Sequence, residues 1–191
     1  NDEFIPVTAH GVKLLSMGLL INESDPVAVR GPLATRYVQQ FLRNVAWGDV
    51  DFLILDLPPG TGDIQLTIVQ TAELDGVVVV TTPQEVALID ARKAIGLFER
   101  VETPILGIIE NMSYFQCPSD GKIYHIFGEG GGEREAARLG VPLLGKIPLD
   151  ISTRSGGDEG LPVALEEPGQ NPVSAAFRQV AEQCARVVLD R

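Results

Sequence analysis

The chain has 191 residues, of which 45% are hydrophobic and 21% are charged. This length and composition suffice for one globular domain with a single core, so we expect residues 1–191 to form one domain. Its net charge of −11 is opposite to the basic footprint of nucleic-acid-binding proteins, so nucleic acid is not an expected partner. No run of about 18 apolar residues occurs, and the acidic start Asn1-Asp2-Glu3 resembles no signal peptide. We therefore expect no membrane association and a cytoplasmic location.

Short apolar runs alternate with helical patterns along the chain. Buried strands are expected at 51–56, 76–81, 105–109 and 143–147, with a weaker candidate at 12–20. Helices are expected after Pro32, over 63–74, around 88–98, over 133–139 and over 171–190. The Gly- and Pro-rich stretch 156–169 is expected to be an irregular loop. This alternation predicts βαβ units, and hence an α/β fold with a mainly parallel sheet.

Single residues are expected to set the helix ends. Asp63 is a candidate N-cap of the helix that follows it, and Asn171-Pro172 is typical of an N-cap followed by the first helical residue. Gly140 is expected to end the helix before it.

The run from Leu53 to Asp63 carries the sharpest chemical pattern. An apolar strand ends in the carboxylate of Asp56, and the turn Leu-Pro-Pro-Gly-Thr-Gly follows before Asp63. A P-loop NTPase needs such a carboxylate, called Walker B, to hold Mg²⁺ beside the β- and γ-phosphates. The glycines would let the turn approach the γ-phosphate and sense it. The structural alternative is an aspartate that only caps a turn.

A Walker B carboxylate implies a Walker A loop, and no segment of the sequence fits one. The run from Gly140 to Lys146 has the spacing, but Ile147 follows where a hydroxyl should bind Mg²⁺. The glycine run 128–132 precedes a helix and could hold an anion, yet it lacks a lysine and a preceding long strand. We therefore expect the chain by itself to bind ATP weakly and to hydrolyse it negligibly.

Five segments, taken in order, carry a family resemblance: Asp56–Asp63, Thr81–Asp90, Glu110–Phe115, Ile126–Gly132 and Leu144–Asp150. Together they resemble the Mrp family, MinD-like P-loop ATPases that carry iron–sulfur clusters and are similar also to the nitrogenase iron protein. The resemblance runs from about Val7 to the end of the chain. It implies a three-layer P-loop NTPase fold truncated at its N-terminus, because the family's Walker A loop and switch I aspartate belong upstream of Asn1.

The resemblance also implies roles in binding ATP and Mg²⁺. Asp56 corresponds to the catalytic, Mg²⁺-binding carboxylate, and Asn111 to a residue that lies against the adenine. The remaining nucleotide-contacting positions are Pro59, Gly60 and Asp63 in switch II, and Pro148, Leu149 and Asp150 beside the base. The alternative for Asn111 is a turn former at the end of a strand.

The family's cluster-binding Cys-x-x-Cys motif is Cys117-Pro-Ser-Asp120 here. Two complete motifs across a dimer axis would supply the four thiolates of a [4Fe–4S] cluster, whereas one cysteine per chain supplies two. Asp120 could add an oxygen ligand, although carboxylates suit harder metals. The alternative is a lone thiol without a metal role. Cys184 falls on an apolar helix face and is expected in the core, and His125 is more typical of a half-buried strand or turn than of a metal ligand.

The leading hypothesis is an ATP-binding iron–sulfur cluster carrier that works as a homodimer and serves apo iron–sulfur proteins. A positioning ATPase of the MinD or ParA kind is a rival, but its membrane form would need a basic amphipathic C-terminal helix, and 171–191 is not basic. A non-enzymatic dimerising scaffold is the second rival, favoured by the missing Walker A loop and the single cysteine.

Overall fold

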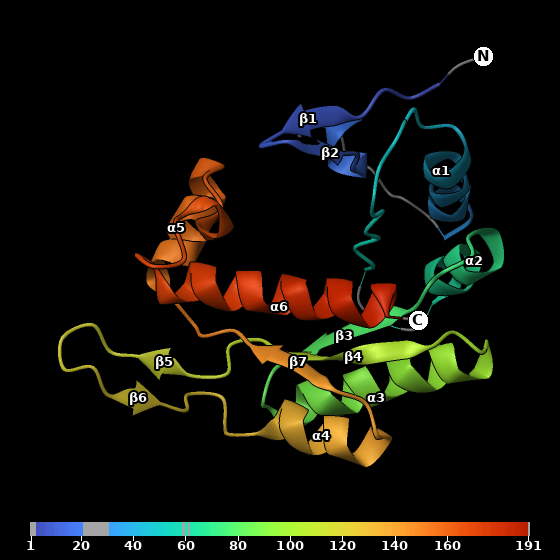
Figure 1. Ribbon diagram of the computed structural model, residues 1–191. Helices are drawn as coiled ribbons and strands as arrows, with labels where there is room; N and C mark the ends of the chain where they lie inside the picture. The colour runs from blue at the N-terminus through green and yellow to red at the C-terminus, as the bar shows by residue number, and fades with distance from the viewer. Residues whose placement is uncertain (1–2, 21–30, 59, 61, 191) are drawn as a thin grey trace. The chain divides into compact units, whose positions relative to one another are not determined.

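The computed structural model describes residues 3–20, 31–58, 60 and 62–190 (Figure 1). The chain divides into two compact units, Asn1–Glu73 and Leu74–Arg191. Whether the two units together form one domain stays a prediction.

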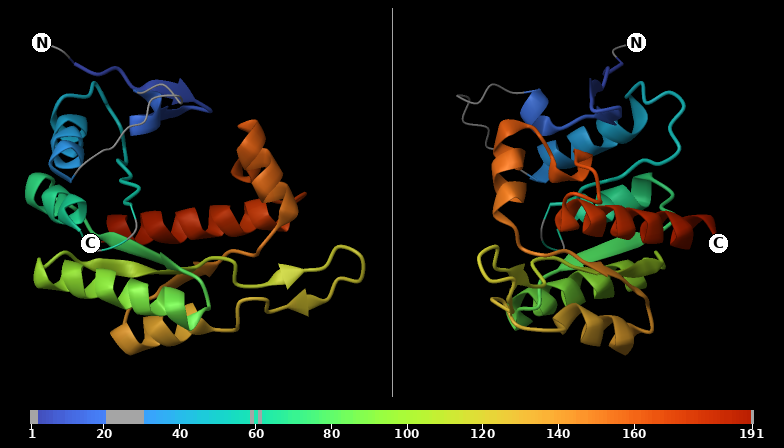
Figure 2. Two further views of the ribbon diagram at one scale, coloured as in Figure 1. Left: turned by 180° about the vertical axis from the view of Figure 1, so that it is seen from behind. Right: turned by 60° about the vertical axis from the view of Figure 1, so that its left-hand side comes forward.

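The second unit is built on a parallel sheet of three strands, in the order β3 (Val77–Thr81), β4 (Ile105–Glu110) and β7 (Leu143–Lys146). The helices α3 (Glu85–Arg100) and α4 (Gly131–Leu139) lie on one side of this sheet, and α6 (Pro172–Leu189) lies on the other (Figure 2). The predicted α/β class with parallel strands at 76–81, 105–109 and 143–147 is therefore confirmed, and the unit has three layers.

Successive residues of β4 point into two separate cores, as expected for a strand buried on both faces. Ile108 packs with Ile95 of α3 and Ala136 of α4, whereas Ile109 packs with Val173 and Val180 of α6. The buried side chains of α3 are those of the predicted stripe, Leu88, Ala91, Ile95 and Phe98.

The helix ends follow the local sequence in two predicted places. Asn171 caps α6, because its side-chain oxygen accepts a hydrogen bond of 2.8 Å from the amide of Val173. Gly140 ends α4 in the left-handed conformation with φ +67°, which glycine adopts without steric cost.

The prediction of an irregular stretch over 156–169 was wrong at its start and for a short turn within it. The helix α5 (Ile151–Glu159) extends into it, and a short 3₁₀ helix, η2 (Val163–Leu165), follows. The glycines of α5 disfavour a helix by propensity, but its ends are fixed by Asp150 as N-cap and by Gly160 in the left-handed region. A hairpin absent from the predicted elements, β5 (Phe115–Gln116) with β6 (Ile123–Tyr124), projects from the same unit (Figure 1).

The first unit contains a hairpin of β1 (Val7–Ala9) and β2 (Val12–Leu14), a 3₁₀ turn η1 (Met17–Leu19), and the helices α1 (Gly31–Arg43) and α2 (Asp63–Thr71). The weak strand candidate at 12–20 thus shortens to β2. Pro32 lies in the first turn of α1, as predicted. The N-cap of α2 is Gly62, and Asp63 is instead the first helical residue, because the extended backbone required of a cap falls at Gly62.

The strand predicted at 51–56 is not formed. These residues have no strand pairing within the described chain, and the side chain of Ile54 is 86% exposed. An apolar run becomes a buried parallel strand only when neighbouring strands take up its backbone groups and side chains cover its faces. Separately, no helix in the described ranges has the length and apolar content needed to cross a bilayer.

Candidate functional site

The turn after β4 is tied to the ends of both neighbouring strands. The amide of Asn111 donates to the carbonyl of Thr81 at the end of β3 (2.7 Å), and the amide of Ser113 donates to the carbonyl of Ile147 after β7 (3.0 Å). Asn111 therefore lies at the carboxyl edge of the parallel sheet, where ligands of open α/β sheets bind.

The turn uses only part of the hydrogen-bonding capacity of the Asn111 side chain. Its Oδ1 accepts a hydrogen bond of 2.9 Å from the amide of Met112, which has the unusual φ of +52°. The turn-former interpretation of Asn111 thus describes one of its contacts. This hydrogen bond uses one acceptor position and involves neither of the two NH₂ donors, so the side chain retains hydrogen-bonding capacity for a ligand.

Glu110, the last residue of β4, is fully buried and was not identified from the sequence. Its Oε1 accepts from the hydroxyl of Ser113 (2.5 Å), and its Oε2 accepts from the amide of Gly132 in the first turn of α4 (2.6 Å). The available signal was a charged residue closing an otherwise apolar strand. This carboxylate fastens the Asn111 turn to the adjoining helix.

The glycine run before α4 has a packing role. A Cβ on Gly131 would lie 2.6 Å from the carbonyl oxygen of Pro83, and one on Gly132 would lie 3.0 Å from the Cβ of Glu110. The anion that meets the N-terminal turn of α4 is the protein's own Glu110. One amide of the run 128–132 is thus used by an internal carboxylate, and the binding of an external anion by this run stays a prediction.

The segment Gly145-Lys146 closes strand β7, in agreement with its rejection as a phosphate-binding loop. The ammonium group of Lys146 lies 2.9 Å from a carboxylate oxygen of Glu133. The hydrogen bond from this pairing is the main reason that the pKa of Lys146 is raised.

The residues after β7 lie beside the same turn. The amide of Leu149 donates to the carbonyl of Tyr114 (2.7 Å). Asp150 caps α5 by accepting from the amide of Thr153 (2.8 Å) and from the hydroxyl of Ser152. Burial acts to raise the pKa of Asp150, but these hydrogen bonds outweigh burial and hold the pKa below its usual value. The carboxylate is thus committed to the helix end, and the backbone of Pro148 and Leu149 is the part that could flank a base.

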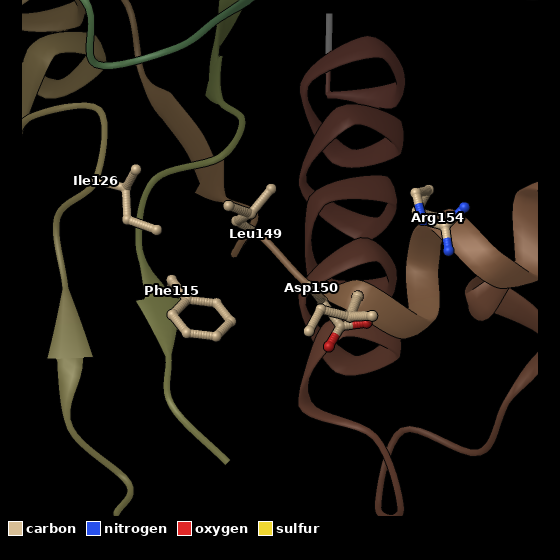
Figure 3. Close-up of a pocket in the computed structure, with 6 residues that line it drawn as sticks. Phe115, Ile126, Leu149, Asp150 and Arg154 are labelled. Atoms are coloured by element: carbon tan, nitrogen blue, oxygen red, sulfur yellow. The ribbon is translucent and has the colours of Figure 1, made fainter. Parts of the chain in front are cut away.

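A shallow hollow of about 270 Å³ opens next to these residues (Figure 3). Its lining is mostly apolar and comprises Phe115, Ile126, Leu149, Asp150, Ile151 and Arg154. It joins the base of the β5–β6 hairpin to the start of α5.

Cys117 and Asp120 lie in one tight turn at the end of this hairpin. The amide of Cys117 donates to the carbonyl of Lys122 (2.9 Å), and the Sγ of Cys117 lies 3.0 Å from the Oγ of Ser119. The hydrogen bond with the Ser119 side chain, followed by those from the backbone at Ser119 and Asp120, lowers the pKa of the Cys117 thiol. The hydrogen bond from the amide of Lys122 lowers the pKa of Asp120.

The remaining potential metal ligands lie elsewhere. Cys184 packs against the core under α6, as predicted, and burial raises its pKa. His125 is partly exposed and lies 3.6 Å from a carboxylate oxygen of Glu129. No group of three or more histidine, cysteine, aspartate or glutamate side chains within the described ranges is arranged to hold a metal ion.

The expected Walker B and switch II residues belong to the first unit. Asp56 and Gly60 are exposed there, and Asp63 begins α2. Pro59 lies outside the described residues. A joint Mg²⁺ and nucleotide site formed by Asp56 with Asn111 and Pro148 stays a prediction.

The comparisons with known proteins agree on one family. A family model named ParA and described as NUBPL iron-transfer P-loop NTPase matches residues 1–185. Iron-sulfur cluster carrier proteins from Pyrococcus horikoshii and Synechocystis sp. are 48% and 47% identical over 172 and 181 residues. These alignments cover 90% and 94% of this chain but only 58% and 51% of the relatives, so the chain spans little more than half of their length.

Solved structures support the same fold. The nucleotide-binding protein of Archaeoglobus fulgidus in complex with ADP matches with a TM-score of 0.70 and 38% identity, over 84% of this chain and 63% of that one. The cell division ATPase MinD of Pyrococcus furiosus matches with a TM-score of 0.59 and 25% identity, over 80% of this chain and 59% of that one.

Proposed function

Because the chain belongs to the ParA family described as NUBPL iron-transfer P-loop NTPase, we propose that it forms the cargo-bearing and base-contacting part of an iron–sulfur cluster carrier. The observation that carries this proposal is that one chain segment connects Asn111 to Cys117. Both residues lie on one short segment, which is hydrogen-bonded to the ends of β3 and β7.

In this proposal the nucleotide binds at the carboxyl edge of the sheet. The side-chain NH₂ of Asn111 would donate to the base, and the backbone at Pro148 and Leu149 would flank it. Asp56 would hold Mg²⁺, and Pro59, Gly60 and Asp63 would respond to the γ-phosphate. Bound ATP–Mg²⁺ would supply the charge to which these groups respond.

The cargo end is the hairpin turn at Cys117 and Asp120. One thiolate and one carboxylate are too few ligands for a cluster, so a homodimer that brings two turns together is part of the proposal. The recipients would be apo iron–sulfur proteins in the cytoplasm. Transfer to them is an exchange of iron ligands and requires no chemistry from the chain beyond holding and releasing the cargo.

One of the rival functions meets a structural objection. A positioning ATPase that bound membranes through α6 would need the apolar face of that helix to be available. In α6 this face is used by the core, where Val173 and Val180 are buried and Phe177 packs against them. A dimerising scaffold without cargo remains as the alternative outcome of the test below.

Anaerobic reconstitution with iron and sulfide tests the cargo role. We expect the unaltered chain and the control Cys184→Ser to bind iron and sulfide with charge-transfer absorption, and Cys117→Ser to bind neither. Loading of Cys117→Ser to the level of the unaltered chain would refute the assignment. A failure of every variant to load would leave the scaffold function.

Nucleotide binding is tested separately by equilibrium dialysis with ADP and with pyrophosphate. Asn111→Ala should weaken the binding of ADP several-fold and leave pyrophosphate binding unchanged, because only ADP carries the base. Equal weakening of both ligands would place Asn111 away from the base.

A further inference from the structure

The β5–β6 hairpin projects from the second unit and has little support of its own (Figure 1). Each strand has two residues, which pair as Phe115 with Tyr124 and Gln116 with Ile123. No residue from 116 to 126 is buried. An isolated two-stranded hairpin is at best marginally stable in water. The order and direction of this hairpin therefore depend on the contacts that hold its two ends to the rest of the unit.

The buried carboxylate of Glu110 contacts the chain on both sides of the hairpin. On the outgoing side, before β5, the hydroxyl of Ser113 donates to its Oε1 (2.5 Å). On the returning side, after β6, the chain runs into α4, where the amide of Gly132 donates to its Oε2 (2.6 Å). Glu110 is 0% exposed, so water does not compete for these two hydrogen bonds. One side chain thus holds both ends of the hairpin.

Glu110 also adjoins the proposed nucleotide edge. Asn111 follows it directly, and the amide of Asn111 donates to the carbonyl of Thr81 at the end of β3 (2.7 Å). The carbonyl of Glu110 accepts from the amide of Ile147 (2.9 Å), the residue before Pro148. A ligand that contacts Asn111 therefore acts on the neighbour of the residue that holds the hairpin.

A backbone contact joins the same edge to the hairpin independently of Glu110. The amide of Leu149 donates to the carbonyl of Tyr114 (2.7 Å), and Leu149 forms a β-bridge with Phe115. This contact uses no side chain, so side-chain substitutions elsewhere leave it in place. The contribution of the Glu110 carboxylate can therefore be removed without cutting every link between the edge and the hairpin.

Resting on the proposed nucleotide contact of Asn111, we infer that Glu110 is a positioning residue through which nucleotide binding at the sheet edge orders the β5–β6 hairpin. Ligand contact with Asn111 fixes the turn after β4, and the carboxylate of Glu110 carries this restraint to Ser113 and Gly132. Both ends of the hairpin are then held more firmly.

The coupling transmits conformational order and involves no covalent step. A nucleotide that orders the hairpin has already met part of the entropy cost that a partner of the hairpin would otherwise meet. The coupling is also reciprocal, so a partner that orders the hairpin raises the affinity of the edge for nucleotide by the same factor. Glu110 itself touches neither ligand.

Hydrogen–deuterium exchange of the intact chain, with and without ADP, tests the inference in peptides covering 117–127. Each variant is measured at an ADP concentration that saturates it by equilibrium dialysis. In the unaltered chain ADP should slow this exchange by about fivefold or more, the lower end of typical coupling. Glu110→Ala should abolish the slowing, and Glu110→Gln, which can keep both hydrogen bonds, should restore it. Ser113→Ala releases only the outgoing end and should reduce the slowing.

Glu135→Ala is the matched control. Glu135 is another buried carboxylate of the same unit, and it pairs with Arg92 of α3 (2.9 Å) and with Arg138 of α4. Both partners lie outside the Asn111 turn and the hairpin. Glu135→Ala should lower the free energy of unfolding measured in urea and retain the ADP-dependent slowing in 117–127. The control thus separates positioning from a general loss of stability.

The outcomes separate the inference from the function on which it rests. If ADP binds the unaltered chain but leaves exchange in the hairpin unchanged, or if Glu110→Ala keeps the slowing, the inference is overturned and the nucleotide proposal stands. Loss of the slowing in Glu135→Ala as well would assign the effect to stability and also overturn the inference. If dialysis detects no ADP binding to the unaltered chain, the proposed nucleotide contact fails and the inference fails with it.

Discussion

Replacing Glu110 with alanine tests whether a buried carboxylate holds the nucleotide-facing turn in place. Glu110 is 0% exposed, and its two oxygens bind groups 3 and 22 residues away in the sequence, the hydroxyl of Ser113 and the amide of Gly132. Alanine would leave both donors buried and unpaired. We expect the second unit to lose stability and the turn that carries Asn111 to loosen.

The magnitude follows from the two contacts. A hydrogen bond to a charged acceptor contributes about 1.5–3 kcal/mol, so two such bonds set an upper range of about 3–6 kcal/mol. Removing the carboxylate also removes its desolvation penalty, which offsets part of the loss. We therefore expect Glu110→Ala to lower the free energy of unfolding by about 2–4 kcal/mol.

Glu110→Gln is the matched control for this prediction. Its amide oxygen can still accept from Gly132, and its NH₂ can donate to the Ser113 hydroxyl, which rotates to accept. We expect a loss of about 1 kcal/mol from the missing charge. The control thus separates the charge of Glu110 from its shape and its hydrogen bonds.

Urea unfolding gives the free energies, and hydrogen–deuterium exchange with mass spectrometry localises the effect. Faster exchange is expected in peptides covering 105–116 and 128–139, with little change in α6. A loss below about 1 kcal/mol for Glu110→Ala, with unchanged exchange at Gly132, would refute the clamp role of this carboxylate.

Two further predictions concern packing and the cargo thiol. A Cβ at Gly145 would lie 2.5 Å from a valine methyl group of α6, so Gly145→Ala should destabilise the chain by about 1–3 kcal/mol. Gly96 lies in mid-helix, and nothing lies within 4 Å of a Cβ there, so Gly96→Ala should stabilise the chain by about 0.5–1 kcal/mol. Urea unfolding measures both free energies. Equal changes in the free energy of unfolding for Gly145→Ala and Gly96→Ala would contradict the packing argument. Ser119→Ala removes the main cause of the lowered pKa of Cys117, so in a Cys184→Ser background the thiolate fraction and the alkylation rate should fall at neutral pH and converge with those of the parent at high pH. A rate ratio independent of pH would argue against a pKa effect.

Much of the second unit follows from local sequence. The apolar runs at 76–81, 105–109 and 143–147 became strands, and the central one, β4, is buried on both faces. The stripe from Leu88 to Phe98 became the buried face of α3 because its spacing matches a helix. The caps at Asn171 and Gly140 are equally local, since each depends on the backbone or side chain of one residue.

Contacts between distant residues decided the rest. The run 51–56 has a strand's composition but no strand pairing in the described chain, because pairing depends on other segments. The helix α5, by contrast, has local caps at Asp150 and Gly160, which offset the low helix propensity of its glycines.

The sequence by itself determined the family motifs, the parallel-strand composition and the chemical identity of Asn111, Cys117 and Asp120. The tertiary structure alone revealed that Glu110 fastens the Asn111 turn to α4, and that the glycine run there receives this internal carboxylate. The reason is physical: periodicity and capping act over a few residues, whereas the burial of a charge depends on which donors the fold brings to it.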